Sequence, residues 1–393
     1  MTDLLSQIDD WGPEKVVVVS DHRSGMKGVL VIDNTARGIG KGGTRMSPTV
    51  TVGEIARLAR VMTWKWAGVD MFHGGAKAGI VGDPNAKNKE EILRAFARKL
   101  SNEVPREYVL GLDMGLTEYD AAIYQDELGD RGAAVGSPYE LGGVPYDQLG
   151  VTGYGVAESA HVAAQHRGID LARARVSIQG FGAVGKAAAK RFADYGSTIV
   201  AISTSLGALH DPQGLDVAEL IRLAAEFGDA AVRHYEGLTP SPVGSEVLVD
   251  CDILVPAALQ DVINASIAGR IRASLIVEGA NLPSSTKALA ILSDRDVLVI
   301  PDFVANAGGI VAAGVAMEAR YSPFRPEAEG ILSLVSSRIR ANTIAVLDEA
   351  AATAVLPHDA ARNIAKARVR AAMVARGQIR SQLDVPQPVS IGA

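Results

Sequence analysis

Three lysines are the residues of this chain whose positions most suggest chemistry. Lys41 and Lys77 each lie close to a pair of glycines, in the runs Gly40-Lys41-Gly42-Gly43 and Gly74-Gly75-Ala76-Lys77. Glycines in such runs indicate close approach of the backbone, which favours a built site over a solvated surface. A lysine amine transfers protons near neutral pH only if burial or neighbouring cations lower its pKa from about 10. Lys65, at the end of a predicted helix, would supply one such cation.

The element between these lysines is a predicted amphipathic helix. Thr51 and Glu54 have the spacing of a capping box, with a hydroxyl at the N-cap and a carboxylate three residues later. The segment that follows carries apolar residues at helical spacing, namely Ile55, Leu58, Ala59 and Met62. Three residues further on, the same face reaches Lys65. The helix therefore presents a lysine on its apolar side, between Lys41 and Lys77 in the sequence.

A second candidate site is a glycine-rich loop in the middle of the chain. Residues 175–179 read as a strand, 186–195 have helical periodicity and 198–202 read as the next strand. Between the first strand and the helix lies Gly180-Phe181-Gly182-Ala183-Val184-Gly185. In this context the glycines permit a tight turn and close approach to a pyrophosphate, whose charge the helix N-terminus stabilises. The loop predicts dinucleotide binding by five residues: Gly180, Gly182, Ala183, Val184 and Gly185.

The type of dinucleotide depends on the end of the second strand. An NAD site of this kind has an acidic residue about 20 positions after the loop, where it binds the ribose 2′-hydroxyl. Here the strand ends in Ser203-Thr204-Ser205, with no carboxylate to repel a 2′-phosphate and no arginine nearby to bind one. We assign Thr204 to the cofactor site, and both NAD and NADP stay open.

The remaining pattern predicts an α/β fold in two domains. Apolar runs at 16–19 and 28–32, separated by a turn, read as a strand pair, and runs at 252–256, 274–278 and 297–301 continue a parallel sheet. We expect a substrate-binding and oligomerisation domain over 1–145 and a doubly wound, Rossmann-type dinucleotide domain over 146–325. Alanine-rich helices over 326–393, divided by Pro357, should pack back on the domain junction.

Composition limits the classes of partner and function that the chain can have. A chain of 393 residues that is 48% hydrophobic and 21% charged can bury a large core, and its net charge of −6 comes from interspersed residues. These features predict small-molecule partners and self-association, and argue against a nucleic-acid or membrane surface. The absence of a leader and of a long apolar run predicts a cytoplasmic protein. Cys251 should be a buried thiol, and the histidines show no metal-ligand spacing.

Taken together, these motifs resemble one family, the glutamate, leucine, phenylalanine and valine dehydrogenases. Matching pieces run in family order through most of the chain. They include Gly40 to Met46, Met62 to Lys65, Gly74 to Lys77, Gly111 to Gly115, Glu140 to Gly143, Thr152 to Gly155, the glycine-rich loop, Glu278 to Asn281, and Asn306 to Gly309. The resemblance implies oxidative deamination of an L-amino acid to a 2-oxo acid and ammonia, with NAD or NADP.

The resemblance also implies roles for individual residues. The lysine matching Lys65 binds the α-carboxylate, Lys77 activates water and polarises the reacting carbon, and Asp113 transfers protons. These roles suit the chemistry, which needs a cation to hold the acid and a group that cycles its proton. Asn281 and Asn306 match residues on the nicotinamide side, while Gly42 and Thr152 fall in motifs of the substrate site. Family members are homo-oligomers that assemble through the N-terminal domain.

The side-chain end of the substrate pocket gives conflicting indications. In relatives that act on glutamate, the residue matching Lys41 pairs with the side-chain carboxylate. Seven residues beyond Asn306, where such relatives usually offer a serine, this chain has Ala313, with Ile310 one turn earlier. A lost neutral hydrogen bond to a charged group costs about 1.5–3 kcal/mol, whereas a retained ion pair can still set the preference. We therefore favour glutamate.

Two alternatives differ from this interpretation. The chain could act on branched-chain or aromatic amino acids, with Lys41 turned away from the pocket. It could instead be a catalytically silent dinucleotide-binding sensor that kept the fold. The joint presence of Lys65, Lys77 and Asp113 argues against a sensor, which has no need of a proton-transfer pair. His73, directly before the glycine pair, either tunes Lys77 or fills space, and we favour packing.

Overall fold

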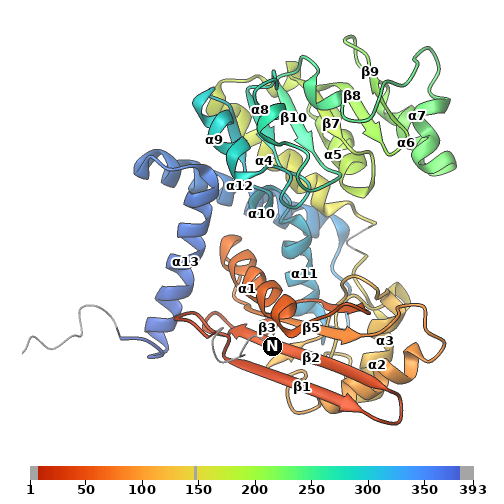
Figure 1. Ribbon diagram of the computed structural model, residues 1–393, viewed down its shortest axis with the longest axis vertical. Helices are drawn as coiled ribbons and strands as arrows, with labels where there is room; N and C mark the ends of the chain where they lie inside the picture. The colour runs from red at the N-terminus through yellow and green to blue at the C-terminus, as the bar shows by residue number, and fades with distance from the viewer. Residues whose placement is uncertain (1–7, 146–147, 381–393) are drawn as a thin grey trace, which may run out of the picture. The chain divides into compact units, whose positions relative to one another are not determined.

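The computed structural model describes residues 8–145 and 148–380, and the chain divides into two units (Figure 1). Unit 1 contains the residues up to Gly143, Arg320–Ser322 and the segment from Arg362. Unit 2 contains Val144–Ala319 and Pro323–Ala361. The region 326–393, predicted to pack as one group on the junction, is therefore divided between the units. Of the three predicted ranges, 1–145, 146–325 and 326–393, residues 1–7, 146–147 and 381–393 lie outside the described residues.

Unit 1 is built on a six-stranded mixed sheet of order β1-β2-β5-β3-β6, with β4 also paired to β5. Its elements are β1 (Lys15–Asp21), β2 (Met26–Asn34), β3 (Gly40–Lys41), β4 (Thr44–Ser47), α1 (Val52–Gly68), β5 (Gly74–Val81), α2 (Lys89–Lys99), β6 (Tyr108–Val109), α3 (Glu118–Leu128), the short 3-10 helix η2 (Tyr139–Leu141) and most of α13 (Pro357–Ala375). The predicted strand pair at 16–19 and 28–32 is confirmed as the antiparallel hairpin of β1 and β2.

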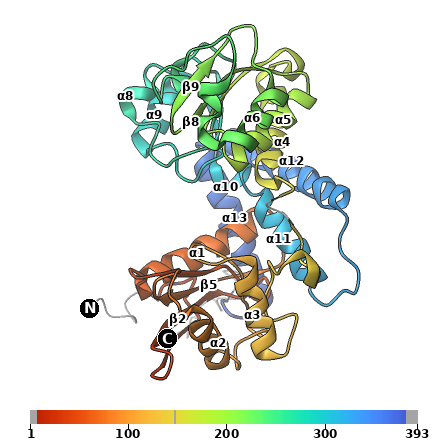
Figure 2. The same ribbon diagram turned by 90° about the vertical axis from the view of Figure 1, so that its right-hand side faces the viewer.

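Strand β5 lies in the middle of this sheet, and its side chains point alternately to the two faces of the sheet. Ala76, Ala78 and Ile80 point into the main apolar core, which also contains Leu93 and Phe96 of α2. Helix α1 packs on the other face, as Figures 1 and 2 show. Because side chains alternate along a strand, Gly75, Lys77 and Gly79 must face α1.

Unit 2 contains the second six-stranded sheet, of order β12-β11-β10-β7-β8-β9. Its elements are α4 (Val151–Arg167), η3 (Leu171–Arg173), β7 (Arg175–Gln179), α5 (Ala183–Asp194), β8 (Thr198–Thr204), β9 (Gly207–His210), α6 (Val217–Phe227), η4 (Gly228–Ala230), α7 (Ala231–His234), η5 (Glu246–Leu248), β10 (Ile253–Pro256), α8 (Ala265–Ala268), β11 (Leu275–Val277), α9 (Thr286–Asp294), β12 (Leu298–Ile300), α10 (Asp302–Ala305), α11 (Gly308–Ala319) and α12 (Ala328–Thr353). Figure 2 shows α5 and α6 on one side of the sheet and α8 and α9 on the other.

The topology of unit 2 is that of a doubly wound dinucleotide fold. All neighbouring strands are parallel except β8 and β9, which form an antiparallel hairpin at one edge. The strand order reverses between β7 and β10, and ligands of such sheets bind outside the carboxyl ends of the strands at this point. The predicted fold class, its five strands and the helix after the glycine-rich loop are confirmed.

The predicted start of α1 is confirmed, but one of the two contacts expected of a capping box differs. Thr51 is the N-cap, and its hydroxyl accepts a hydrogen bond from the backbone N–H of Glu54 at 3.2 Å. The Glu54 carboxylate, which a capping box would direct back to the helix start, instead binds Arg45 Nη1 at 2.7 Å. An arginine within reach offers a charge-assisted bond, which is stronger than one to a neutral amide.

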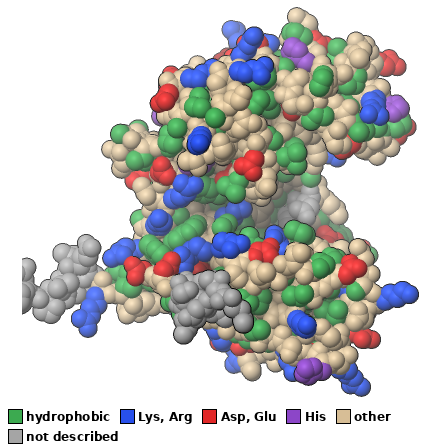
Figure 3. All heavy atoms as spheres, viewed as in Figure 1, with side chains coloured by type: hydrophobic (Ala, Val, Ile, Leu, Met, Phe, Trp, Pro, Cys, Tyr) green, Lys and Arg blue, Asp and Glu red, His purple; other side chains and the backbone are tan. Residues whose placement is uncertain are grey.

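Three further predictions concern the surface and the single thiol. In the part of the chain that is described, no helix is both long and apolar enough to cross a membrane. Basic and acidic side chains are interspersed over the face shown in Figure 3, in both units. Cys251 is buried as predicted, and burial raises the pKa of its thiol to about 12.

Candidate active site

Lys77 lies on the face of β5 that α1 covers, and its side chain is 92% buried. The glycines on either side of it along this face allow α1 to approach. A Cβ on Gly75 would lie 2.0 Å from Thr63 Oγ1, and one on Gly79 would lie 2.7 Å from Ile55 Cδ1. Close packing of this helix removes water from around Lys77, as the glycine pairs in the sequence predicted.

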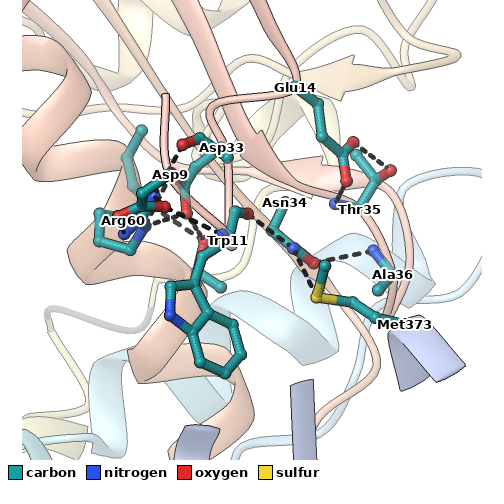
Figure 4. A network of polar contacts seen from close by, with 12 residues as sticks. Asp9, Trp11, Glu14, Asp33, Asn34, Thr35, Ala36, Arg60 and Met373 are labelled. Atoms are coloured by element: carbon teal, nitrogen blue, oxygen red, sulfur yellow. Dashed lines mark hydrogen bonds and ion pairs between the residues drawn. The ribbon is translucent and has the colours of Figure 1, made fainter. Parts of the chain in front are cut away.

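A polar network anchors α1 in this position (Figure 4). The carboxylate of Asp33, at the end of β2, accepts hydrogen bonds from Thr63 Oγ1 at 2.5 Å and from Arg60 Nε at 2.9 Å. Arg60 also binds the Asp9 carboxylate at 2.8 Å. Since Arg60 and Thr63 lie on α1, these contacts fix the turn of the helix that carries Lys65.

The buried Lys77 forms an ion pair with Asp113, a partly exposed residue in the loop after β6. Lys77 Nζ is 3.1 Å from Asp113 Oδ2, and the same oxygen accepts a bond from Arg45 Nε at 2.9 Å. Burial would raise the pKa of Asp113, but Lys77 and Arg45 outweigh it and hold that pKa below its usual range. The structure thus joins the two predicted catalytic residues and keeps the carboxylate ionised.

The amine of Lys77 has the property that proton transfer requires. Burial lowers its pKa below the ordinary lysine value, and Arg45 and Lys65 act in the same direction, while Asp113 opposes them. Lys65 is therefore close enough to act electrostatically on Lys77, as the sequence predicted. A lysine with a lowered pKa exchanges its proton closer to neutral pH.

Lys41 lies on the same face of the sheet as Lys77. It pairs in register with Gly75, two residues before Lys77 along β5. Its ammonium, almost fully buried, donates to the backbone carbonyls of Val109 at 3.2 Å and Leu110 at 2.9 Å. Burial, together with Lys77 and Arg320, lowers the pKa of Lys41 to about 7.

His73 is a packing residue close to these lysines. Its ring meets Trp66 of α1 edge-on, with the ring centroids 4.7 Å apart. Burial, and then Lys41 and Arg320, lower the pKa of His73 to about 4, so the ring is neutral at neutral pH. This contact agrees with the favoured interpretation that His73 fills space.

In unit 2, the glycine-rich loop has the geometry that a dinucleotide needs. Gly180 has a φ of +90°, a left-handed conformation that favours glycine, and a Cβ there would lie 2.6 Å from Ala258 Cβ. A Cβ on Gly185 would lie 1.8 Å from the Gly180 carbonyl oxygen, so this glycine lets α5 pack tightly on the sheet. A Cβ on Gly182 would meet nothing within 4 Å. The open space lies at the N-terminus of α5, the position at which folds of this kind bind a pyrophosphate.

The other predicted cofactor residues lie at the same edge of the sheet. Gly180 N donates to Ser203 Oγ at 3.0 Å, which ties the loop to the end of β8, one residue before Thr204. Asn306 Nδ2 donates to Asn281 Oδ1 at 3.1 Å, so the two predicted asparagines meet beyond the ends of β11 and β12. A Cβ on Gly279 would lie 3.4 Å from Val184 Cγ1. The carboxyl ends of four strands thus bring these residues together.

Two family models match the chain. The model described as "Glu/Leu/Phe/Val dehydrogenase, dimerisation domain" matches residues 13–129, and "Glutamate/Leucine/Phenylalanine/Valine dehydrogenase" matches residues 142–377, which is more than half of the chain. The chain belongs to this family. The resemblance stated from the motifs is confirmed.

Relatives within this amino-acid dehydrogenase family carry the name glutamate dehydrogenase. That of Thermotoga maritima is 38% identical over 77% of this chain and 76% of its own length. An NADP-specific enzyme of Saccharolobus shibatae is 36% identical (77% and 75%), and the NAD-specific enzyme A of Halobacterium salinarum is 33% identical (88% and 80%). The Leu-bound hetero-hexameric glutamate dehydrogenase from Thermus thermophilus superposes with a TM-score of 0.79, 30% identity, and coverage of 93% of this chain and 90% of that one.

The remaining predicted substrate residues of this amino-acid dehydrogenase lie on α4 and α11 in unit 2. Ile310 and Ala313 are one turn apart on a partly exposed face of α11. A Cβ on Gly309, beside Ile310, would lie 3.2 Å from Thr152 Oγ1, which places Thr152 next to this face. Gly42 is a close-contact position in unit 1, since a Cβ there would lie 1.7 Å from the Ala76 carbonyl oxygen.

Sequence reasoning gave no role to Arg45, which the structure places in the site. Arg45 joins the carboxylates of Asp113 and Glu54, at 2.9 and 2.7 Å. Its position two residues after the glycine pair at 42–43 was the available signal, but spacing alone does not reveal which carboxylate a long side chain reaches. Among the described residues, no three His, Cys, Asp or Glu side chains form a group that could hold a metal ion.

Proposed function

We propose that this protein catalyses the reversible, NAD(P)-dependent oxidative deamination of an L-amino acid, with L-glutamate and 2-oxoglutarate as the preferred pair. The observation that carries the proposal is the Lys77–Asp113 ion pair, in which a buried lysine with a lowered pKa meets an ionised carboxylate at 3.1 Å. Membership of the dehydrogenase family and the glutamate dehydrogenases among its relatives support it. Unit 1 then acts on the amino acid and unit 2 binds the dinucleotide.

The reaction needs defined proton movements from this chain's own residues. A bound nicotinamide supplies the acceptor for the hydride that leaves Cα. Lys65 holds the α-carboxylate, and neutral Lys77 accepts a proton as water adds to the iminium carbon. Asp113 relays a proton to the amine, which leaves as ammonium. Water oxygen becomes the 2-oxo oxygen, and one proton is released per amino acid oxidised.

The dinucleotide is bound by the loop from Gly180 to Gly185 and the N-terminus of α5. Thr204, Asn281 and Asn306 complete this assignment at the ends of the neighbouring strands. NAD and NADP are both found among the relatives, as the cofactors of enzymes 33% and 36% identical to this chain.

Lys41 is the residue to which we assign recognition of the substrate's side-chain carboxylate. Gly42 of unit 1 and Thr152, Ile310 and Ala313 of unit 2 are also assigned to substrate binding. Because the pKa of Lys41 is about 7, its ammonium is partly lost above neutral pH. We expect the preference for 2-oxoglutarate over 2-oxo-4-methylpentanoate, measured as a ratio of kcat/KM, to fall as pH rises above about 7. Lys41→Leu should lower this ratio by about 10- to 100-fold at pH 7 and remove its pH dependence.

The test of the proposed function is a matrix of steady-state assays with ammonia. NADH and NADPH are each combined with 2-oxoglutarate, 2-oxo-4-methylpentanoate and phenylpyruvate. The proposal predicts turnover that is highest with 2-oxoglutarate. Higher turnover with an apolar 2-oxo acid would show that this acid, and not 2-oxoglutarate, is the preferred substrate. A lack of turnover with all three acids would refute the proposed dehydrogenase activity.

We also propose that the protein assembles into a homo-oligomer through unit 1. The matching family model for residues 13–129 is described as a dimerisation domain. Strand β1, at the edge of the unit 1 sheet, carries Val18 with 64% of its surface exposed. An exposed apolar edge strand of a sheet is normally covered. Light scattering coupled to gel filtration should give a mass of at least twice 41.1 kDa.

A further inference from the structure

The end of β8 lacks an acidic residue in the sequence but has one beside it in space. Ser205 Oγ donates a hydrogen bond to Asp229 Oδ2 at 2.5 Å, and Thr204 Oγ1 donates to the Asp229 backbone oxygen at 2.7 Å. Asp229 belongs to η4, after α6, and is 24 residues beyond Ser205. One hydroxyl of the strand end thus binds the Asp229 carboxylate, and its neighbour binds the backbone of the same residue.

This strand end is directly linked to the glycine-rich loop. Ser203 Oγ accepts a hydrogen bond from the backbone N–H of Gly180 at 3.0 Å, so Ser203, Thr204 and Ser205 connect the loop to Asp229. In a sheet of this strand order, the ribose next to adenine lies at the end of the second parallel strand, which here is β8. Asp229 therefore lies where a ribose-binding carboxylate is needed.

We propose that Asp229 takes this role and makes the enzyme select NAD over NADP, an inference that rests on the proposed function. An ionised carboxylate only accepts hydrogen bonds, and about four lone-pair sites are available, of which Ser205 uses one. A ribose 2′-hydroxyl donates to such a group. A 2′-phosphate only accepts and is negatively charged, so Asp229 repels it.

The hydroxyl of Ser205 strengthens this argument. A serine at this position can donate a hydrogen bond to a 2′-phosphate, but here the donor is directed to Asp229. The arginine that could favour NADP is Arg233 of α7, which is exposed and lies four residues beyond Asp229. Ser205 binds the carboxylate of Asp229 and Thr204 binds its backbone oxygen, so both hydroxyls hold Asp229 beside the strand end where the ribose is expected.

Calorimetric titration of the full-length protein with NADH and NADPH tests the assignment without relying on turnover. We expect wild-type protein to bind NADH at least about tenfold more tightly, and Asp229→Asn to reduce the ratio of the two Kd values about tenfold. Asp250→Asn is the matched control, because it removes the same charge beside Arg175 at the amino-terminal end of β7, away from the carboxyl ends of the strands. It should leave the ratio unchanged.

Three results would overturn the inference: tighter binding of NADPH by wild-type protein, a ratio that Asp229→Asn leaves unchanged, or a ratio that Arg233→Ala shifts while Asp229→Asn does not. Ser205→Ala tests whether the hydrogen bond from Ser205 is itself needed for selectivity. It removes this bond but keeps the Asp229 carboxylate, so the variant should retain the preference for NADH. If NADH binds selectively but no 2-oxo acid is turned over, the proposed function fails while the assignment of Asp229 stands.

Discussion

One buried and one partly buried carboxylate of this protein are each paired with two cations, and the two clusters differ in the type of cation. In unit 2, Glu158 of α4 has no exposed surface, and its oxygens accept bonds from Arg191, Tyr195, Ser336 and Arg340 at 2.5–2.8 Å. In unit 1, Asp113 binds one arginine, Arg45, and one lysine, Lys77. The first cluster contains only guanidinium cations, whereas the second contains an amine.

This difference separates a structural cluster from a reactive one. Burial would raise the pKa of Glu158, but bonds from Ser336, Tyr195 and the two arginines lower it to about 2. Arginine cannot lose its proton at any ordinary pH, so this cluster stays charged and joins α4, α5 and α12. Lys77 has a lowered pKa and can change its charge. A buried carboxylate indicates chemistry only when its partner can titrate.

The largest expected effect is on turnover, from Lys77→Ala. Loss of the group that cycles the proton should lower kcat about 10³-fold, while the Kd for the dinucleotide, measured by titration, changes little. Lys77→Arg should not restore activity, because a guanidinium does not release its proton. Lys89→Ala is the matched control, since Lys89 also forms an ion pair, with Asp120 at 2.7 Å, but has no catalytic role. Near-normal kcat in Lys77→Ala would refute the role of this amine.

The reverse result is expected for Glu158→Gln. This change leaves two partly exposed guanidinium groups without their carboxylate and should lower the free energy of unfolding by about 1.5–3 kcal/mol. The folded fraction should keep kcat within about threefold, since no reacting group changes. Chemical denaturation and assays below the unfolding midpoint measure the two quantities. A fall in kcat without a loss of stability would remove the distinction between the clusters.

The pH dependence of stability sharpens the same contrast. The pKa of Glu158 falls from 4.5 to about 2 on folding. Its ionised carboxylate therefore contributes fully to the free energy of unfolding above about pH 4.5, and this contribution is lost as the pH falls towards 2. Wild-type protein should therefore lose stability over this window relative to Glu158→Gln, and the two unfolding free energies should converge near pH 2. Curves that stay parallel from pH 6 to pH 2 would contradict the lowered pKa.

The contrast also explains what could be predicted from the sequence. Lys77 and the loop from Gly180 to Gly185 lie in short motifs whose spacing determines their local geometry, so their roles were predicted. The Glu158 cluster could not be found in this way, because Arg191 and Arg340 reach it from helices 33 and 182 residues away. The same limit applies to Arg45 and Asp229, whose partners depend on how the elements pack. The long-range partners of charged side chains were therefore harder to predict than the charged residues themselves.

The smallest predicted effect is a shift in the pH dependence of kcat for oxidative deamination. It is also the most direct test of the role of Lys77. Because Lys77 must be neutral to accept a proton, kcat should rise with pH through a pKa below the ordinary lysine value of 10.5. The carboxylate of Asp113 raises the pKa of Lys77, so Asp113→Asn should move this rising limb to lower pH, at a lower plateau. The Glu158→Gln profile should match wild type.

This comparison of kcat against pH for wild type and Asp113→Asn tests the central claim, that a buried lysine paired with Asp113 transfers the proton. The predicted result is a rising limb below 10.5 that moves to lower pH when the carboxylate is removed. A limb that stays in place or moves to higher pH in Asp113→Asn would contradict it.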